Sequence, residues 1–306
     1  LPFLYIYLAK SKPDVIITER PRTNNVALRC RRIFSLKNLI ISSVHLPPSI
    51  KCKNMNPQNK KSYLESLKQS YSANDGIIAV SDGVAKDLKL VFQIPSEKIY
   101  TIYNPVVTSK LLTLSQKPIE HPWLKYKSKP VLLSVGRLVE QKDFPTLIRA
   151  FSILRRNMDC RLIILGDGAQ RVGLEKLIYE YELTQDVDLP GFTSNPYTFM
   201  AQADLFVLSS AWEGFRNVLV EALALGTSCV STDCPYGPAE ILKNGKLGSL
   251  VPVGDEKAFA GAIRHRLQNP VNPDLLQEEG QKYSAEKCAD GYLCVINDGL
   301  KHSKFQ

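Results

Sequence analysis

Short runs of β-branched and other apolar residues alternate with longer stretches of helical periodicity along almost the whole chain. Strands separated by helices are typical of parallel sheets that carry helices on their faces. In the first half, strands are expected at DVIIT, NLIISSV, GIIAVS and IYTIYN, and in the second half at VLLSVG, RLIILGDG, VDLPGF, LFVLSS, SCVSTD and SLVPVG. The sequence therefore predicts an α/β fold with a six-stranded sheet in its second half.

The length of 306 residues is enough for two cores of ordinary domain size. The segment from Thr108 to Lys129 contains several Ser, Pro and Lys residues and no clear periodicity, which favours a boundary there. We expect a first domain over residues 1–120, a second over 121–284, and a C-terminal helix within 285–306 that packs back on the first domain. Because no Gly-rich turn follows the first predicted strand, the first domain is expected to lack its initial strands.

Charge is distributed unevenly between the halves. Residues 1–128 carry 20 Lys and Arg against 8 Asp and Glu, whereas residues 129–306 carry 19 against 22. A basic first half favours a phosphate-rich partner such as an anionic membrane surface, and the alternative is a solvated surface with an incidental excess of charge. A nucleic-acid partner is not expected, because no basic segment is interleaved with aromatic residues at a recognisable spacing.

The apolar runs and the cysteines bear on location. No run approaches the roughly 18–20 apolar residues that a membrane-spanning helix requires. The 7 cysteines are odd in number, form no C-x-x-C pair and lie partly inside apolar runs, which is typical of reduced thiols. We expect a cytoplasmic protein, either free or bound to the cytoplasmic face of a membrane.

The segment SVGRLVEQKD follows a predicted strand and precedes a predicted helix. Its polar residues then lie at the carboxyl edge of a parallel sheet, where open α/β folds bind ligands. Gly136 permits close backbone approach, Arg137 offers a planar fork for phosphate oxygens, and Lys142 adds a point charge. The alternative is an ordinary loop with surface charges.

The segment EGFRNVLVEALALG lies between two further predicted strands. A helix that begins near its RN pair leaves Glu213 in the preceding turn and puts Glu221 in the second helical turn. Both carboxylates are then expected to accept hydrogen bonds from vicinal hydroxyls of a sugar or ribose, although Glu221 is alternatively a buried helix residue. The backbone N–H groups at the start of this helix form an anion site by geometry and dipole, and they belong to Phe215, Arg216, Asn217 and Val218.

Two weaker features complete the set. His45, in IISSVHLPP, ends a strand of the first half, but a lone histidine is more often structural than functional. The G-x-G of LGDGAQR lacks the third glycine of a dinucleotide-binding loop, so a tight turn explains it better than a nucleotide site.

Taken together, GRLVEQKD, GDG, the GF pair at Gly191 and Phe192, SSAWEGFRNVLVEALALG and EILKNGKLGSLVPVGD resemble retaining glycosyltransferases of family 4. These enzymes have the GT-B fold, in which two Rossmann-like domains face each other across a cleft. The resemblance covers residues 130–260 in order and extends more loosely from Lys12 to Pro105.

The resemblance implies a role for each motif. Arg137 and Lys142 would hold the donor diphosphate, and the helix amides would add to this. Glu221 would bind the ribose, Glu213 and His45 the transferred sugar, while Gly191 and Phe192 would flank the base. The implied reaction moves a hexosyl or N-acetylhexosaminyl group from a UDP-sugar to a glycolipid, polysaccharide or oligosaccharide acceptor, with retention and without a bound metal or other cofactor.

Two departures from the family pattern keep alternatives open. Nothing matches the Gly-rich loop near the family's start, and CPYGPAEIL replaces the Gly-Gly pair that often precedes the later glutamate. The alternatives are a catalytically impaired remnant that binds a nucleotide sugar and a phosphorylase or sucrose-synthase-like enzyme of the same fold.

Overall fold

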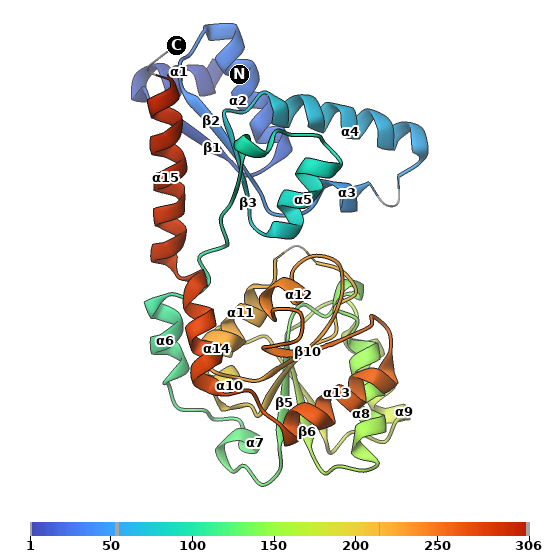
Figure 1. Cartoon of the computed structure of the whole chain (residues 1–306). Coiled ribbons are helices and arrows are strands. Elements are labelled where there is room, and N and C mark those ends of the chain that lie inside the picture. The colour runs from blue at the N-terminus through green and yellow to red at the C-terminus, as the bar shows by residue number, and fades with distance from the viewer. Residues whose placement is uncertain (1, 53–54, 214, 304–306) are drawn as a thin grey trace. The chain divides into compact units, whose positions relative to one another are not determined.

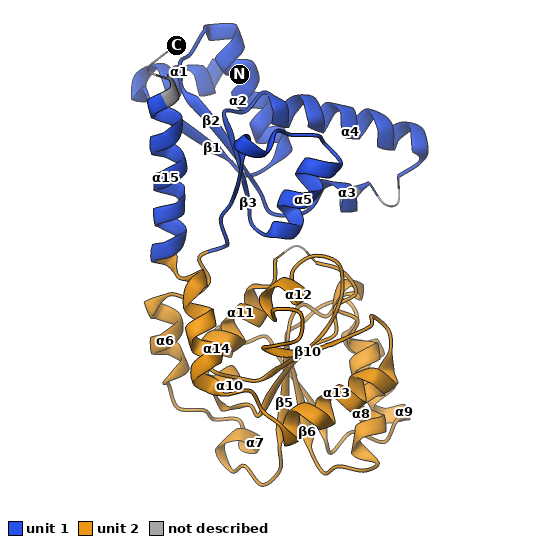
Figure 2. Cartoon of the chain, viewed as in Figure 1, with its two compact units in different colours: residues 1–104, 286–306 blue, residues 105–285 orange. Residues whose placement is uncertain are grey.

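The computed structural model describes residues 2–52, 55–213 and 215–303 of the chain (Figure 1). They fall into two compact units, coloured separately in Figure 2: the first comprises Leu1–Asn104 and Glu286–Gln306, and the second comprises Pro105–Ala285. Each unit has its own parallel sheet and its own helices, so the predicted α/β fold class is confirmed.

The sheet of the first unit has the order β1-β2-β3-β4, and all its strand pairs are parallel. Each strand lies within one of the segments expected from the sequence. Their bounds are β1 (Val15–Thr18), β2 (Leu39–Val44), β3 (Gly76–Ala79) and β4 (Ile99–Thr101). Strands β2 and β3 are buried along their whole length, as expected for interior strands of a sheet covered on both faces.

The helices of the first unit include one from the far end of the chain. They are α1 (Pro2–Ser11), α2 (Pro21–Phe34), α3 (Pro48–Lys51), α4 (Pro57–Ser72), α5 (Asp82–Leu90) and α15 (Ala285–Ser303), with a short 3-10 turn, η1 (Ser96–Lys98). Helices α2 and α4 begin with Pro in the first turn, where its missing N–H leaves no helical hydrogen bond unmade.

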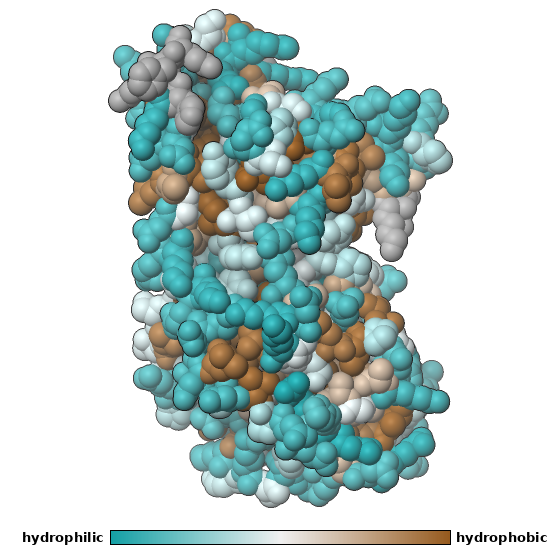
Figure 3. Space-filling model, viewed as in Figure 1, coloured by the Kyte–Doolittle hydropathy of each residue, from teal (hydrophilic) through white to brown (hydrophobic). Residues whose placement is uncertain are grey.

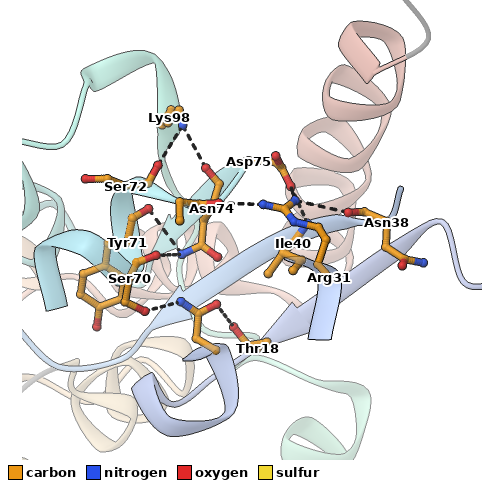
Figure 4. Close-up of polar contacts among 12 residues, drawn as sticks. Thr18, Arg31, Asn38, Ile40, Ser70, Tyr71, Ser72, Asn74, Asp75 and Lys98 are labelled. Atoms are coloured by element: carbon orange, nitrogen blue, oxygen red, sulfur yellow. Dashed lines mark hydrogen bonds and ion pairs between the residues drawn. The ribbon is translucent and has the colours of Figure 1, made fainter. Parts of the chain in front are cut away.

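A polar network fixes α2 and α4 to the sheet. The buried Asn24 amide donates to Ser70 Oγ at 2.9 Å and accepts from Thr18 Oγ1 at 3.0 Å, which links α2 to α4 and to β1. Figure 4 shows Arg31 of α2 paired with Asp75, whose carboxylate also accepts the Ile40 N–H at 2.7 Å. Buried polar groups with partners of this kind specify one arrangement of the elements.

Helix α15 adds an apolar face to the first unit. Its Val295 packs with Ile41, Ile78 and Ile102 from three different strands or strand ends. The sequence predicted a C-terminal helix here that packs back on the first domain, and α15 lies in that unit. Residues at both ends of the chain therefore share one core.

The sheet of the second unit has the order β10-β9-β8-β5-β6-β7. The first five of its strands lie within the predicted segments, and the sixth begins one residue before its segment. They are β5 (Val131–Val135), β6 (Arg161–Leu165), β7 (Val187–Gly191), β8 (Leu205–Leu208), β9 (Cys229–Thr232) and β10 (Gly248–Val251). The chain winds from β5 to β7 in one direction and then from β8 to β10 in the other. The strand order therefore reverses between β5 and β8.

Nine helices surround this sheet within the described part of the second unit: α6 (Ser109–Ser115), α7 (Pro122–Lys125), α8 (Phe144–Arg155), α9 (Arg171–Glu180), α10 (Pro196–Gln202), α11 (Asn217–Ala224), α12 (Pro238–Ile241), α13 (Glu256–Gln268) and α14 (Pro273–Gly280), with 3-10 turns η2 (Glu140–Lys142) and η3 (Gln281–Tyr283). The core includes Phe144 and Phe151 of α8 and Phe259 of α13, each at most 1% exposed.

The boundary between the units differs from the sequence-based one. Residues 105–120 were expected in the first domain, but α6 packs on α10 in the second unit. The Leu114 carbonyl accepts hydrogen bonds from Asn195 Nδ2 and Thr198 Oγ1, both at 3.0 Å, and Leu111 is buried. The segment is rich in Ser, Pro and Lys and so resembles a linker in composition. The buried Leu111 side chain and the hydrogen-bonded Leu114 carbonyl nevertheless attach it to the second unit.

Within the described residues, no helix combines the length and the apolar character that crossing a membrane requires. On the face drawn in Figure 3, hydrophilic residues cover most of the surface and apolar residues form smaller patches between them.

Candidate active site

The reversal of strand order in the second unit positions the loops that the sequence singled out. Ligands of open α/β sheets bind beyond the carboxyl ends of the strands at such a reversal. Strand β5 leads into the loop with Gly136, Arg137 and Lys142, and β8 leads into the loop with Glu213. Because β5 and β8 are neighbours in the sheet, these two loops leave it side by side.

Backbone hydrogen bonds join the two loops. Ser209 Oγ donates to the Lys142 carbonyl at 2.7 Å, and the Ala211 N–H donates to the Gln141 carbonyl at 2.9 Å. The Gln141 side chain returns a hydrogen bond to the Trp212 carbonyl at 3.0 Å. The position of Lys142 relative to Glu213 is therefore fixed by main-chain contacts and not by the two side chains alone.

The glycines of the β6 loop explain how closely it approaches the β5 loop. A Cβ on Gly166, whose φ is +142°, would lie 1.9 Å from the Gly136 carbonyl oxygen. A Cβ on Gly168, with φ +157°, would lie 2.5 Å from the Leu138 carbonyl oxygen. No other residue type fits these positions, which confirms a structural role for the G-x-G pair.

A cluster of charged side chains lies where the β5 and β8 loops meet. Lys142 Nζ is 2.6 Å from Glu213 Oε1, and the Arg216 guanidinium pairs with the same oxygen. Ser210 Oγ donates to that oxygen as well, at 3.0 Å. The arginine is only 1% exposed, and its Nη2 lies 2.7 Å from Cys234 Sγ. One carboxylate oxygen thus accepts hydrogen bonds from Lys142 and Ser210 and forms an ion pair with Arg216.

The electrostatic setting of Lys142 favours an anionic ligand. Burial, followed by the charges of Arg216 and Arg137, lowers the pKa of Lys142 to about 8, while the Glu213 carboxylate beside it favours the charged ammonium. Its aliphatic stem passes over Gly136, where a Cβ would lie 3.1 Å from Lys142 Cε. Three basic groups face one ionised carboxylate here, and this excess of positive charge suits a diphosphate.

Arg137 and the start of α11 contribute to the same edge. Arg137 is exposed at the end of β5 and is near enough to lower the pKa of Lys142. Helix α11 begins at Asn217, as predicted, and the N–H groups of Leu219 and Val220 already bond to the Arg216 carbonyl. The amides of residues 215–218 therefore lie at the positive end of the helix.

Glu221 lies in the second turn of α11, and burial raises its pKa to about 7. Burial, followed by the charge of Glu221, raises the pKa of Tyr197 on α10, so these two side chains are neighbours. Glu221 is partly buried, and a carboxyl group with a raised pKa at the carboxyl edge of such a sheet is typical of functional sites.

A pocket of about 350 Å³ adjoins these loops at the ends of β5 and β6. Gly136, Arg137 and Gly166 line one part of it, and Phe192 lines another. Phe192 is 81% exposed, and Gly191 before it has φ +94°, which favours glycine. The sequence associated the GF pair with a planar base, and the structure places Phe192 in a pocket with residues of the β5 and β6 loops.

His45 belongs to the first unit and is described separately. It is exposed at the end of β2 and lines a pocket of about 310 Å³ together with Glu19, Arg20, Ser43 and Tyr63. Its Nε2 lies 3.2 Å from Ser43 Oγ.

Sequence reasoning missed two members of the cluster. Arg216 was considered for its backbone amide, whereas its side chain is a buried ion-pair partner of Glu213. Cys234 was treated as an ordinary thiol, but it contacts that arginine. No local pattern distinguishes these positions, because both contacts arise only when separate loops meet. No group of three or more His, Cys, Asp or Glu suited to a metal ion occurs within the residues that the structure describes.

Comparisons with known proteins agree with this arrangement. Residues 115–283 match the family described as glycosyl transferases group 1, and residues 1–110 match glycosyltransferase family 4. The chain is 35% identical to the N-acetylgalactosamine-N,N'-diacetylbacillosaminyl-diphospho-undecaprenol 4-alpha-N-acetylgalactosaminyltransferase of Campylobacter jejuni, over 99% of this chain and 80% of that protein. It is 28% identical to the lipopolysaccharide core biosynthesis glycosyltransferase LpsE of Rhizobium meliloti, over 97% of this chain and 79% of that protein.

Solved structures share the fold. The apo form of the lipopolysaccharide outer core galactosyltransferase WaaB matches with a TM-score of 0.75 at 23% identity, over 96% of this chain and 78% of that one. The Anabaena protein HepE in complex with UDP matches with a TM-score of 0.77 at 17% identity, over 96% and 82%. The two sheets are therefore those of the GT-B fold, and the chain belongs to the group 1 glycosyltransferases of family 4, enzymes that transfer glycosyl groups.

Proposed function

We propose that this enzyme transfers a hexosyl or N-acetylhexosaminyl group from a UDP-sugar to a hydroxyl of a lipid-linked or other oligosaccharide acceptor, with retention of anomeric configuration. The observation that carries the proposal is the cluster of Lys142, Glu213 and Arg216 at the reversal of the sheet, with Arg137 beside it. The names of two relatives support the substrate class, since the Campylobacter protein is an N-acetylgalactosaminyltransferase of an undecaprenyl-diphosphate-linked sugar and HepE was crystallised with UDP.

Each group has a definite role in this proposal. Arg137, Lys142 and the amides at the start of α11 bind the diphosphate, and Glu221 accepts hydrogen bonds from the ribose. Glu213 binds hydroxyls of the transferred sugar, and the base lies in the pocket beside Phe192. Negative charge grows on the diphosphate as the glycosidic bond breaks, and positive groups that are already in place lower the energy of that transition state. No metal ion is required for this role.

The surroundings of Glu213 favour a front-face route over a covalent intermediate. Its Oε1 already accepts hydrogen bonds from Lys142 and Ser210 and pairs with the Arg216 cation, which lowers its nucleophilicity. We expect the departing phosphate oxygen to take the proton of the acceptor hydroxyl while that hydroxyl attacks from the same side. In the first unit, the pocket that His45 lines would accommodate a sugar of the acceptor.

Calorimetry with UDP tests the assignment of the diphosphate site. Lys142→Ala removes a charged hydrogen-bond donor, which is worth about 1.5–3 kcal/mol, so affinity should fall roughly 10- to 100-fold. Lys110→Ala is the matched control, because Lys110 is exposed on α6. Equal affinities for the two variants would reject the site.

Transfer assays test the reaction itself. A panel of UDP-hexoses and UDP-N-acetylhexosamines is supplied with an undecaprenyl-diphosphate-linked sugar, and the anomeric configuration of the product is read by NMR. Inversion would contradict the proposal, as would turnover only with phosphate or fructose as acceptor.

A further inference from the structure

The last helix of the chain reaches the site of the first unit. Tyr292 of α15 donates a hydrogen bond from its hydroxyl to Ser43 Oγ at 3.3 Å, although the two residues are 249 positions apart. Ser43 Oγ in turn lies 3.2 Å from His45 Nε2. All three residues belong to the first unit, and Ser43 is only 2% exposed. A chain of two hydrogen bonds therefore connects α15 to the imidazole.

The direction of the first hydrogen bond favours one direction for the second. A serine hydroxyl has one proton, and a neutral imidazole has one N–H and one acceptor nitrogen. Tyr292 supplies the proton between its own oxygen and Ser43 Oγ, so the proton of Ser43 is available for His45 Nε2. Burial raises the pKa of Tyr292, which keeps its hydroxyl protonated and a donor at neutral pH. An imidazole that accepts at Nε2 carries its own proton on Nδ1.

We propose that Tyr292 and Ser43 are positioning residues that hold His45 as the neutral Nδ1–H tautomer. His45 lines the pocket with Glu19, Arg20 and Tyr63, and only its Nε2 has a hydrogen-bond partner among the described residues, so in this proposal Nδ1–H is the donor offered to a ligand there. That ligand is an oxygen acceptor, such as a hydroxyl or carbonyl oxygen of a sugar. An effect of this tautomer on kcat rests on the proposed function, whereas the tautomer itself can be measured without any substrate.

A purely structural role for Tyr292 is the competing explanation. Its ring packs against the apolar cluster of Ile41, Ile78, Ile102 and Val295, so it contributes to the attachment of α15 in either case. Removing only the hydroxyl separates the two explanations, because Tyr292→Phe keeps the ring and its packing. Ser43→Ala breaks the same chain from its middle and leaves the tyrosine untouched.

NMR of ¹⁵N-labelled histidine measures the tautomer without any substrate. The His45 signals are assigned as those missing from His45→Gln, and long-range proton–nitrogen correlations at pH 7.5 distinguish Nδ1–H from Nε2–H. We expect the Nδ1–H pattern in the wild type and a shift toward a mixture of tautomers in Tyr292→Phe and Ser43→Ala. The control, Tyr7→Phe, alters an exposed tyrosine of the same unit and should leave the pattern unchanged. An Nε2–H pattern in the wild type, or an unchanged pattern in both variants, would overturn the proposal.

Kinetics then test whether the chain acts through His45. Tyr292→Phe should lower kcat about two- to tenfold, with UDP affinity unchanged. In the His45→Gln background the same substitution should cause no further loss, because its target is gone. Equal losses in both backgrounds would indicate a structural role and contradict the coupling. If no donor supports transfer, the proposed function fails, while the NMR result still decides the tautomer.

Discussion

The affinity for a UDP-sugar should depend on pH with a maximum between pH 7 and 8, because two buried groups of opposite charge titrate at its edges. Burial raises the pKa of Glu221 to about 7, so this carboxylate loses its charge as the pH falls below that value. Burial and the neighbouring arginines lower the pKa of Lys142 to about 8, so its charge is lost as the pH rises further. Under the proposed roles, protonation of Glu221 weakens ribose binding, and deprotonation of Lys142 weakens diphosphate binding.

The size of each effect follows from the ionised fraction. One pH unit below its pKa, a carboxyl group is ionised in roughly one molecule of eleven, which corresponds to an affinity about tenfold lower, or about 1.4 kcal/mol. The same arithmetic applies to Lys142 one unit above its own pKa. Because neither group is fully charged at the maximum near pH 7.5, affinity should be about sixfold below that maximum near pH 6 and again near pH 9.

Calorimetry in buffers of equal ionic strength measures this profile. The ligand should be a UDP-hexose and not UDP, since a terminal phosphate titrates near pH 6 and would add its own acid limb. Glu221→Gln cannot ionise and should flatten the acid limb. Lys142→Arg keeps its charge at high pH and should flatten the alkaline limb. A constant affinity from pH 6 to 9, or an acid limb that survives in Glu221→Gln, would refute the reasoning.

Four further outcomes are expected. Glu213→Gln should leave UDP affinity unchanged and weaken a UDP-sugar, whereas Glu221→Gln should weaken both; identical losses in calorimetry would contradict this division. UDP affinity should be the same with and without EDTA, and a loss that manganese restores would count against the metal-independent site. Glu221→Gln should also stabilise the protein above pH 8 by on the order of 3 kcal/mol, because folding raises the pKa of this carboxyl group from 4.5 to about 7 and so disfavours its charged form. The difference in stability should vanish below pH 4.5, where the group is protonated in both states, and thermal unfolding at several pH values measures it. Binding to vesicles should rise with their phosphatidylglycerol content and fall with salt, since 20 of the 39 Lys and Arg lie in residues 1–128 against only 8 acidic residues; salt-insensitive binding, or none, would reduce the asymmetry to a matter of solubility.

Most of the fold follows from local patterns in the sequence. Strand runs such as LFVLSS and VLLSVG are short, apolar and separated by helical periodicity, which is enough to predict parallel sheets. The location of Lys142 near Glu213 follows from one further rule, because loops at the carboxyl ends of adjacent parallel strands share an edge. The compact units of the structure divide at residue 105 and not near residue 120, and composition does not reveal that Leu111 is buried.

Contacts between distant segments could not be predicted in this way. The buried side chain of Arg216 and its contact with Cys234 depend on how the loops after β8 and β9 close over each other. Likewise, nothing in the sequence of α15 indicates that Tyr292 meets Ser43. Such contacts result from tertiary packing, and a search for periodicity within a short window does not detect them.

The two glycines that bring the β6 loop against the β5 loop have a consequence for molecular adaptation. Because Gly166 and Gly168 contact the carbonyls of Gly136 and Leu138 so closely, neither loop can move without the other. The backbone of these two loops is thus held in place by their mutual packing, and if it binds the diphosphate as proposed, little conformational entropy is lost there on binding. Substitutions that change donor preference during evolution should therefore accumulate outside the contact between these two loops, at exposed residues that line the pocket, such as Phe192.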